Sequence, residues 1–475
     1  MPRLEVRDES TGVEPPARMR AGRLNFIAQP QKTVCLMMKT NIWIAVLGGF
    51  ALAGLLPAGA QEKPAAKKPN IILIYSDDVG LGDIGCFGGP FPTPQIDRLA
   101  AGGTRFDYCY STPLCGPSRC ETLTGRYPFR TGLINNRSAN AIQPGREIMI
   151  PTVLKQAGYV TASVGKWGQM SFGPGEWGFD EHLVFKGSGR YWRSQTTQYR
   201  VNGEPQNLPE GKYLPDLMHD FVVNFITQHK DQPFFVYYPM SHIHGPILRT
   251  PDSRAGASPD ELYRDNIAYM DKLVGKLMAE LDRLHLREKT LVLFTGDNGT
   301  AHFGVKTATV NGRQISGMKG TMLEGGSRVP LLANWPGVTP TGRVNHDLVD
   351  FSDFFGTFAE LAGAPLPGGV KLDSHSFAAQ LKGQPGRPRD WVYVELNGNS
   401  YARNARFKLT NRGELFDLAE APYRETLVSP TTTDSAAMAG RKSLQEILDQ
   451  HPAAPRANQG ETAAKPAKRK ARRQK

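Results

Sequence analysis

The chain has 475 residues, of which 40% are hydrophobic and 21% are charged, a composition ordinary for a globular enzyme. Its length is enough for one large domain and a smaller one. The net charge of +12 comes mostly from the two ends, because residues 456–475 carry eight Lys or Arg against one Glu, and residues 1–60 carry seven basic and four acidic residues. The body between them is nearly neutral. A basic tail can bind nucleic acid or anionic polymers, but such an end is more commonly solvated, and we predict no specific nucleic-acid partner. We expect residues 451–475 to form a disordered basic tail.

A short apolar run, residues 42–56, follows Lys39 and precedes Ala58-Gly59-Ala60. It is too short for a membrane span, which needs about 20 apolar residues. A charged start, an apolar middle and a small-residue end are typical of a secretory signal peptide. We therefore predict a signal peptide at 37–60 and no stable membrane span after its cleavage. Export to the periplasm or the medium follows, and an uncleaved anchor helix is the alternative.

The segments on either side of this signal have no predicted fold. Residues 1–36 are polar and mixed in charge, and this segment is too long to be the leader of a signal peptide. We expect translation to start at Met37 or Met38. Residues 61–68, rich in Lys, Pro and Ala, predict a linker.

Apolar runs and helical patterns alternate along the rest of the chain. Near-continuous apolar runs predict buried parallel strands at 70–75, 159–164, 233–238 and 290–295. Helix signals predict helices at 94–101, at 214–225 and behind the capping box Ser258-Pro259-Asp260-Glu261. Short strands at 391–395, 407–410 and 414–418 predict a small antiparallel domain, whereas residues 180–212 lack periodicity and predict loops near the substrate.

Oxygen ligands follow two of the predicted strands. Asp77 and Asp78 come after the first strand, and Asp297 and Asn298 come after the strand at 290–295. Ligands of α/β sheets bind beyond the carboxyl ends of the strands, so the two pairs meet if the strands are neighbours. Three carboxylates and an amide oxygen suit a hard cation, and we predict Ca²⁺, with Mg²⁺ as the alternative.

The stretch from Cys115 to Arg126 reads C-G-P-S-R-C-E-T-L-T-G-R. Pro117 suits the first turn of a helix, which places Cys115 at a helix N-terminus, where unpaired N–H groups attract anions. Arg119 adds a fixed cation one turn later. This pattern predicts a nucleophile, or its precursor, that faces an anionic substrate.

Three further residues follow predicted strands or glycine-rich segments and are candidate partners of that anion. Lys166 stands in Gly165-Lys166-Trp167, His244 in S-H-I-H-G-P, and Lys319 in M-K-G-T. A lone Lys or His is commonly a surface or packing residue, and we interpret His242 in that way. The position of His244 at the same sheet edge as the acids favours a functional role, and Lys166 at the end of a predicted strand is a candidate sulfate ligand. The basic, glycine-rich segment around Lys319 does not by itself assign a role.

Taken together, these motifs resemble those of one enzyme family. The string C-x-P-S-R followed by L-T-G-R resembles the signature of the type I sulfatases, members of the alkaline phosphatase superfamily. The other motifs resemble that family's sequence in the same order: N-I-I-L-I-Y-S-D-D-V-G, T-P-Q-I-D-R-L-A-A-G-G, G-K-W, H-G-P, G-D-N-G, M-K-G-T with E-G-G-S-R-V-P, and E-L-F-D-L. The resemblance extends from Pro69 to about Glu425.

The resemblance implies a fold and a domain division. The fold is α/β, with a large, mostly parallel mixed sheet sandwiched by helices and a smaller C-terminal antiparallel-sheet domain. Residues 69–384 would form the catalytic domain and residues 385–450 the small C-terminal α+β subdomain.

The resemblance also implies a mechanism. A formylglycine-generating enzyme would oxidise Cys115 to formylglycine, whose hydrate attacks the sulfur of a sulfated small molecule or polysaccharide. The implied catalytic residues are Cys115, Arg119, Lys166, His244 and Lys319. The implied metal ligands are Asp77, Asp78, Cys115, Asp297 and Asn298.

One position departs from the family pattern. The family usually reads G-K-W-H-L-G, whereas this chain has Gly168 in place of the histidine that contacts formylglycine. Losing one oriented donor costs a factor of about a hundred or more in rate, and Gln169 or His242 are candidate substitutes. Two alternative functions remain: a phosphonate or phosphate-diester hydrolase with the same nucleophile, and a non-catalytic protein that binds sulfated polymer.

Overall fold

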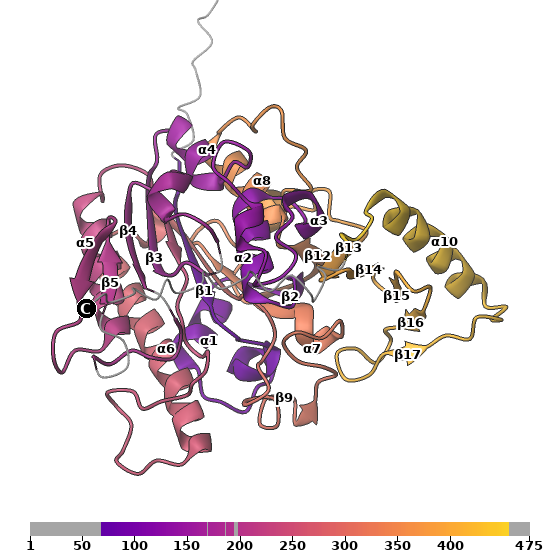
Figure 1. Ribbon diagram of the computed structural model, residues 1–475, viewed down its shortest axis with the longest axis horizontal. Helices are drawn as coiled ribbons and strands as arrows, with labels where there is room; N and C mark the ends of the chain where they lie inside the picture. Colours follow the sequence, from indigo (N-terminus) through magenta and orange to yellow (C-terminus); the bar gives the residue numbers. More distant parts are fainter. Residues whose placement is uncertain (1–67, 169, 186, 194–197, 456–475) are drawn as a thin grey trace, which may run out of the picture. The chain divides into compact units, whose positions relative to one another are not determined.

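The computed structural model describes residues 68–455 except 169, 186 and 194–197 (Figure 1). The predicted leader and signal peptide, nearly all of the linker, and residues 456–475 of the predicted tail lie outside the described residues. No helix in the described part of the chain has the length and apolar character needed to cross a membrane.

A ten-stranded mixed sheet forms the centre of the fold (Figure 1). Its strands, in spatial order, are β12 (Arg343–Asp350), β2 (Thr104–Tyr110), β11 (Arg328–Asn334), β8 (Thr290–Gly296), β1 (Asn70–Ser76), β7 (Phe234–Tyr238), β3 (Val160–Lys166), β4 (Glu181–Phe185), β5 (Gln198–Val201) and β6 (Glu204–Asn207). Only β11 and β5 run against the others. The four strands predicted from apolar runs are β1, β3, β7 and β8, and they are neighbours at the centre of the sheet.

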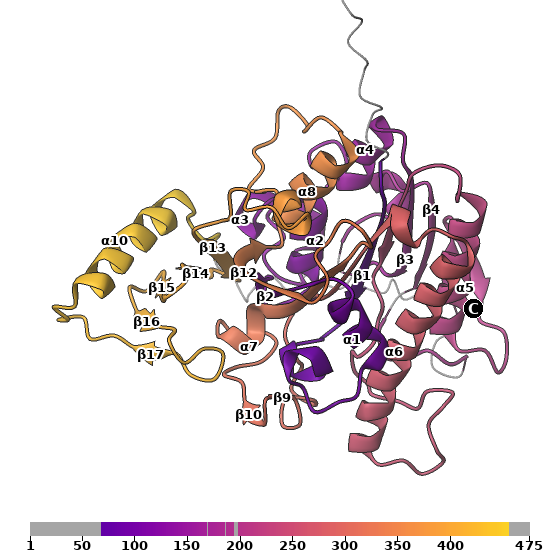
Figure 2. The same ribbon diagram turned by 180° about the vertical axis from the view of Figure 1, so that it is seen from behind.

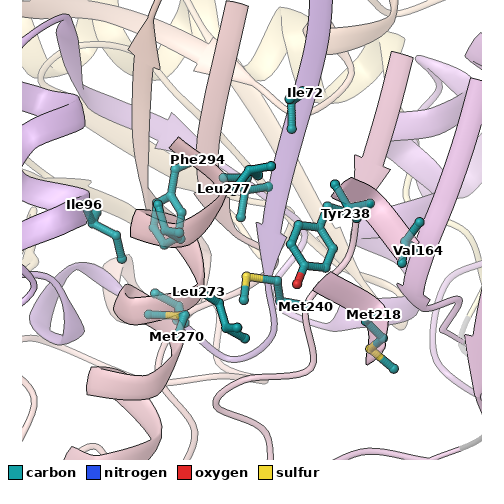
Figure 3. Packing of buried hydrophobic residues seen from close by; sticks show 14 of the residues in the cluster. Ile72, Ile96, Val164, Met218, Tyr238, Met240, Met270, Leu273, Leu277 and Phe294 are labelled. Carbon is teal, nitrogen blue, oxygen red and sulfur yellow. The ribbon is translucent and has the colours of Figure 1, made fainter. Parts of the chain in front are cut away.

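Helices cover both faces of this sheet, because successive residues of a strand point to opposite faces. Ile72 and Ile74 of β1 pack with α1 (Pro94–Ala101), α5 (Leu214–Gln228) and α6 (Pro259–Arg283), and part of this layer is drawn in Figure 3. Ile71 and Leu73 face the other layer, which contains α2 (Cys115–Thr124), α4 (Ile150–Gln156) and α8 (Asp353–Ala362). The predicted sandwich of helices around a mostly parallel sheet is therefore confirmed.

The predicted helix starts are also confirmed. Helix α6 begins after a capping box in which the Ser258 N–H donates to the Glu261 carboxylate at 2.8 Å, and the Ser258 side chain accepts the Glu261 N–H. Helix α1 begins at Pro94, as predicted from Thr93-Pro94.

The C-terminal region forms a second, antiparallel sheet (Figure 2). Its strands follow the chain order, β13 (Val392–Leu396), β14 (Asn399–Arg403), β15 (Phe407–Thr410), β16 (Leu415–Asp417) and β17 (Thr426–Leu427), and α10 (Ser435–Gln450) packs against it. His451 lies among aromatic rings that include Tyr127 and Tyr393, and the Ala454 N–H donates to Glu395 at 2.7 Å.

Shorter elements connect these layers. They are α3 (Pro128–Thr131), α7 (Glu324–Ser327), α9 (Ala378–Leu381), β9 (Thr309–Val310) and β10 (Arg313–Gln314).

The prediction of loops for residues 180–212 is wrong. Strands β4, β5 and β6 lie in this segment and extend the sheet at one edge. The residues of β6 are all exposed, so this hairpin lacks the apolar alternation that would have indicated strands. The turn between β5 and β6 contains Asn202 and Gly203, both with positive φ, which is typical of a tight hairpin.

Candidate active site

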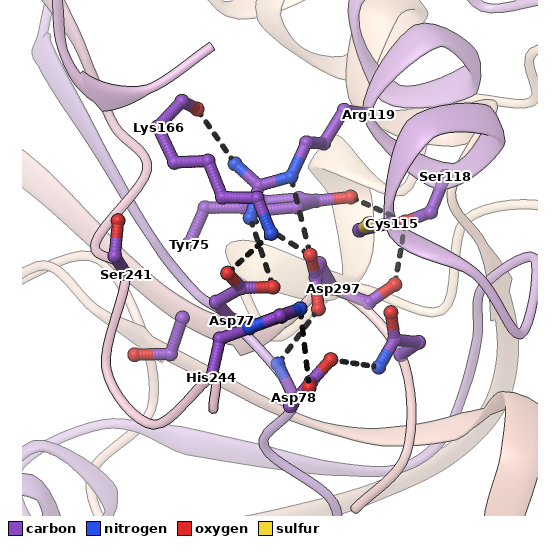
Figure 4. A network of polar contacts seen from close by, with 12 residues as sticks. Tyr75, Asp77, Asp78, Cys115, Ser118, Arg119, Lys166, Ser241, His244 and Asp297 are labelled. Carbon is purple, nitrogen blue, oxygen red and sulfur yellow. Dashed lines mark hydrogen bonds and ion pairs between the residues drawn. The ribbon is translucent and has the colours of Figure 1, made fainter. Parts of the chain in front are cut away.

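The acidic residues meet because their strands are neighbours in register. Ser76 at the end of β1 pairs with Gly296 at the end of β8. The Asp297 N–H then donates to the Ser76 carbonyl at 2.8 Å, which fixes Asp297 beside Asp77 (Figure 4). Both aspartates are fully buried. The predicted meeting of the two strand ends is confirmed.

Asp78 and Asn298 complete this carboxylate cluster. Asp78 has φ of +62°, and its N–H donates to Asp297 Oδ1 at 2.9 Å. The Asn298 amide donates to Asp78 Oδ1 at 2.9 Å. Two buried oxygens of the cluster, Asp77 Oδ1 and Asn298 Oδ1, have no hydrogen-bond partner. Buried polar atoms normally have partners, so these two oxygens indicate a place for a ligand that the protein itself does not supply.

The donor atoms are close enough to share one cation. One oxygen of Asp77, one of Asp297 and Cys115 Sγ all lie within 4.8 Å of one another, and the same holds for Asp77, Asp78 and His244. The donor set is dominated by carboxylate and amide oxygens, the ligands that calcium prefers. The predicted metal ligands therefore fit a hard divalent cation.

Cys115 is the first residue of α2 and is buried, with 1% of its surface exposed. Helix α2 is hydrogen-bonded to the ends of two strands. The Ser118 hydroxyl donates to the Asp297 carbonyl at 2.5 Å and is also hydrogen-bonded to Tyr75 at 2.7 Å. The start of the helix, and with it Cys115, is thereby fixed against the strand that ends in Asp297.

Arg119 is fully buried and lies beside the carboxylates (Figure 4). Its Nε and Nη2 donate to Asp297 Oδ2 at 3.1 and 2.7 Å, and its Nη1 donates to the Lys166 carbonyl at 2.9 Å. Nη2 also lies 3.6 Å from Asp77 Oδ1. The guanidinium therefore contacts two carboxylates. The sequence predicts instead a cation that faces the substrate.

The two candidate lysines also pair with the acidic cluster. Lys166 Nζ donates to Asp77 Oδ2 at 2.5 Å, and Lys319 Nζ donates to Asp78 Oδ1. Burial lowers the pKa of both lysines, but their aspartate partners outweigh it and raise the pKa of each above its usual value. Both ammonium groups therefore stay charged at neutral pH.

The buried aspartates respond in opposite directions. Burial raises the pKa of Asp77, but Lys166 together with His244 and Arg119 outweighs it and lowers the pKa below its usual value. Burial and the neighbouring Asp77 raise the pKa of Asp297. One carboxylate thus resists protonation while its neighbour resists ionisation, as expected for closely spaced acids in one site.

His244 lies at the open side of the cluster, with 30% of its side chain exposed. Its Nδ1 lies 2.6 Å from the Gly245 carbonyl, so Nδ1 carries the proton and donates it there. Nε2, at 3.8 Å from Asp78 Oδ2, is then available to accept or release a proton. This geometry suits a general acid or base.

His242 has a different environment. It is buried among tyrosine rings, and its Nε2 is hydrogen-bonded to the Tyr213 hydroxyl at 3.1 Å. Burial lowers its pKa to about 3, so the ring is neutral. The interpretation of His242 as a packing residue agrees with this geometry, and a role in replacing the missing histidine does not. Gln169, the other candidate substitute, lies outside the described residues.

Comparisons with known proteins identify the family. The family model described as sulfatase matches residues 69–364. Human arylsulfatase A is 35% identical over 398 residues, which cover 74% of this chain and 77% of the relative. The chain belongs to the sulfatase family.

Other relatives agree with this assignment. N-acetylgalactosamine-6-sulfatase of the dog (Canis lupus familiaris) is 36% identical over 376 residues, which cover 72% of this sulfatase and 71% of the relative. The crystal structure of Ps i-CgsB superposes with a TM-score of 0.70 at 28% identity and covers 81% of this sulfatase and 92% of that chain. The protein is accordingly a sulfuric ester hydrolase with the alkaline phosphatase-like fold.

One polar neighbour of Cys115 has no signal in the sequence. Asn136 lies in the segment between α3 and α4, and its amide nitrogen is 3.4 Å from Cys115 Sγ. Its sequence context, I-N-N-R-S, has the composition of an ordinary polar loop. No spacing relates it to Cys115, so only the fold brings the two residues together.

Proposed function

We propose that this sulfatase is an exported enzyme that hydrolyses sulfate esters of carbohydrates, with formylglycine at position 115 and a bound calcium ion. The observation that carries the proposal is the position of Cys115. Its sulfur lies at a helix N-terminus within 4.8 Å of an Asp77 oxygen and an Asp297 oxygen. A nucleophile precursor would thus lie directly beside a hard-cation site in one buried cluster.

The chain offers a ligand set for the cation. Asp77, Asp78, Asp297 and Asn298 would hold it, with the residue at position 115 as a further ligand, and the two unpartnered oxygens of Asp77 and Asn298 support this assignment. A divalent cation there would polarise a sulfate oxygen and lower the pKa of a bound hydroxyl. Formylglycine, once hydrated, would supply the attacking oxygen that a thiol lacks.

The remaining residues bind the substrate and move protons. Lys166 and Lys319 carry charges that attract sulfate oxygens, each worth about 4 kcal/mol of raw attraction at about 4 Å and an effective dielectric near 20, before desolvation. His244 is partly exposed, with Nε2 3.8 Å from Asp78 Oδ2, and would protonate the departing alcohol oxygen. Arg119 orients the carboxylates and fixes α2 against them.

The names of the relatives support a carbohydrate substrate. One relative is an N-acetylgalactosamine-6-sulfatase, and the solved structure of Ps i-CgsB in complex with k-i-k-neocarrahexaose superposes with a TM-score of 0.71 at 28% identity. That complex covers 82% of this sulfatase and 96% of the other chain. We therefore infer a sulfated saccharide as the natural substrate class.

Mass spectrometry of the tryptic peptide Phe106–Arg119 tests the nucleophile. Protein made together with a formylglycine-generating enzyme should contain an aldehyde at position 115, and protein made without that enzyme should contain a thiol. An intact thiol in the first preparation contradicts the proposal. The same peptide contains Cys109, which is buried and provides an internal unmodified control.

Substrate comparison tests the reaction. Modified enzyme should turn over an aryl sulfate faster than the matching aryl phosphonate, and release inorganic sulfate from sulfated galactosamine or carrageenan oligosaccharides. Faster turnover of the phosphonate would favour the alternative hydrolase. Polymer binding without turnover of any sulfate ester would favour a non-catalytic protein.

Export is tested separately by N-terminal sequencing of the protein recovered outside the cytoplasm. A mature chain that begins near Gln61 is expected, because the predicted signal peptide ends at Ala60. Recovery only of a chain that retains residues 37–60 would contradict cleavage.

A further inference from the structure

Asn136 makes two contacts at the start of α2. Its Oδ1 lies 3.0 Å from the backbone nitrogen of Gly116, and its Nδ2 lies 3.4 Å from Cys115 Sγ. The side chain is half-buried, and its Oδ1 is also 3.7 Å from the same sulfur. One amide therefore spans the helix terminus and the nucleophile.

The first contact fixes the orientation of the amide. A backbone N–H can only donate, so the atom that faces Gly116 must be the amide oxygen. The NH₂ group is then the part of Asn136 that faces Cys115 Sγ as a donor. The sulfur of the unmodified residue stands in for an oxygen carried by the same carbon after conversion to formylglycine.

The segment that carries Asn136 is held in place by its neighbours. Asn135 donates from Nδ2 to Asn397 Oδ1 at 3.1 Å, and the Asn397 N–H donates to the Ile134 carbonyl at 3.2 Å. The Arg137 N–H donates to Asn135 Oδ1 at 2.8 Å. Asn397 lies in the turn between β13 and β14, so the C-terminal sheet helps to position Asn136.

A different position near the nucleophile lacks a side chain. Gly168, where the family has a histidine, has φ of +87°, and a Cβ built there would lie 3.0 Å from Arg119 Cδ. The chain thus has no side-chain donor at residue 168, whereas Asn136 presents one to Sγ from the segment after α3.

We propose that Asn136 is a catalytic residue of this sulfatase, which donates a hydrogen bond from Nδ2 to an oxygen of hydrated formylglycine at position 115. This inference rests on the proposed function. The hydrogen bond stabilises the hydrate over the free aldehyde and orients its oxygens between the metal ligands and the substrate. A hydrogen bond of this kind changes an equilibrium by roughly 2- to 13-fold, and an oriented donor in an active site changes the rate by a larger factor.

Two substitutions separate donation from helix capping. Asn136→Ala removes both contacts, whereas Asn136→Asp keeps an acceptor for the Gly116 N–H and removes the donor. Asn140→Ala, at an exposed residue of the same segment, is the matched control. Each protein is produced with the formylglycine-generating enzyme, and its aldehyde content is measured on the peptide Phe106–Arg119.

The first measurement is turnover of an aryl sulfate, normalised to aldehyde content. Both Asn136 variants should lose about tenfold or more in kcat, and Asn140→Ala should keep the value of the unchanged protein. Repulsion between a new carboxylate and the anionic substrate acts on KM, so kcat at saturating substrate isolates the loss of the donor.

The second measurement does not depend on turnover. The rate at which an aminooxy probe labels the aldehyde in the folded protein reports the fraction of free aldehyde. Asn136→Ala should label faster than the unchanged protein by roughly 2- to 13-fold, and Asn140→Ala should not differ. This shift is not expected if Asn136 only caps the helix.

The outcomes distinguish this inference from the function on which it rests. A thiol at position 115 in the unchanged protein overturns both. With aldehyde present, normal kcat and labelling in Asn136→Ala overturn the role of Asn136 alone. Loss of activity in Asn136→Ala with full kcat in Asn136→Asp assigns the residue to helix capping and likewise overturns the proposal.

Discussion

The backbone conformation of Gly168 and its closeness to Arg119 restrict which side chains this position can carry. Its left-handed backbone is a conformation that costs residues with a side chain about 1–2 kcal/mol. The nearest atom to a built Cβ belongs to Arg119, whose guanidinium holds Asp297. A side chain at this position therefore acts on the carboxylate cluster through Arg119.

We predict that placing the family's histidine at position 168 lowers both stability and sulfatase activity. Gly168→His and Gly168→Ala should both lose about 1–2 kcal/mol of unfolding free energy and show lower kcat/KM for an aryl sulfate, because Arg119 must shift. Thermal denaturation and steady-state kinetics measure the two effects. Higher activity of Gly168→His than of the unchanged enzyme would mean that the backbone can rearrange to admit a histidine.

Glu395, remote from the cluster, gives a pH-dependent prediction. Burial raises its pKa to about 7, one carboxylate oxygen accepts the Ala454 N–H, and the other has no hydrogen-bond partner. In the unfolded chain the carboxyl ionises near pH 4.5. The folded protein therefore loses stability as pH rises from about 4.5 to 7, by on the order of 3 kcal/mol.

Glu395→Gln should remove this loss, because the amide keeps the acceptor and never ionises. The variant should be more stable than the unchanged protein at pH 8 and about equal to it at pH 4.5, as measured by urea unfolding. Glu414→Gln, at an exposed glutamate, is the control and should change neither value. If Glu395→Gln and the unchanged protein were equally stable at pH 8, ionisation of Glu395 would not lower the stability of the folded protein, and the prediction would be wrong.

Residues at the ends of buried strands could be predicted from the strand pattern, whereas residues in loops could be predicted only where a motif resembles the family, as for His244 and Lys319. Asp77, Lys166 and Asp297 follow apolar runs, and parallel strands bring such ends together. Asn136 and Glu324 contact site residues or support them from polar or glycine-rich segments, where the sequence has no periodicity that fixes a position in space. The commitment of Arg119 to carboxylates likewise depends on distances that only the fold sets.

At the scale of elements, the C-terminal sheet supports the segment that carries Lys319. Glu324 of α7 is buried, and its carboxylate accepts hydrogen bonds from Tyr110 and is paired with Arg328 and Arg403 at 3.3 Å each. Lys408 of β15 donates to the Met322 carbonyl at 3.1 Å. Burial raises the pKa of Glu324, but the arginines outweigh it and the net pKa is lowered, so the carboxylate stays charged.

We predict that Glu324→Gln weakens this support. Two buried arginines would lose their counter-charge, which costs about 3–5 kcal/mol of unfolding free energy. The displaced segment should also lower kcat, because Lys319 reaches Asp78 from it. Calorimetry and kinetics below the unfolding transition measure both, and Glu414→Gln again serves as the control. Full kcat in a destabilised Glu324→Gln would show that Lys319 is positioned independently of α7.

Two strands on one side of the four central strands, β2 and β11, were not predicted, for identifiable reasons. Strand β2 reads T-R-F-D-Y-C-Y and mixes charged with aromatic residues because it lies between β11 and β12, away from the centre. Strand β11 contains Pro330, which cannot donate a ladder hydrogen bond, and its register with β2 shifts at that point. Pro330 and the glycines before it remove the usual sequence signal of a strand, and the sheet accommodates the proline with a bulge.

For the whole molecule, the acidic cluster predicts a link between cation binding and stability. Calcium that binds only the folded state adds about 2.7 kcal/mol of unfolding free energy at a concentration one hundred times its Kd. Chelation should therefore lower Tm even in protein whose Cys115 is unmodified, and added calcium should restore it. Asn298→Ala, which removes one unpartnered oxygen, should need more calcium for the same rise. A Tm indifferent to chelator and calcium would contradict a metal in this cluster.

The place of β1 at the middle of the sheet also has a consequence for how the chain folds. Its side-chain contacts reach Phe234 and Thr290, which lie 164 and 220 residues further along the chain. Contacts between such distant residues require large loops to close first, and folding rates fall as contacts become less local. During synthesis, Asp77 and Asp78 therefore cannot contact Asp297 until β8 has left the ribosome. We therefore expect assembly of the carboxylate cluster to be a late event in folding, and folding of this chain to be slow.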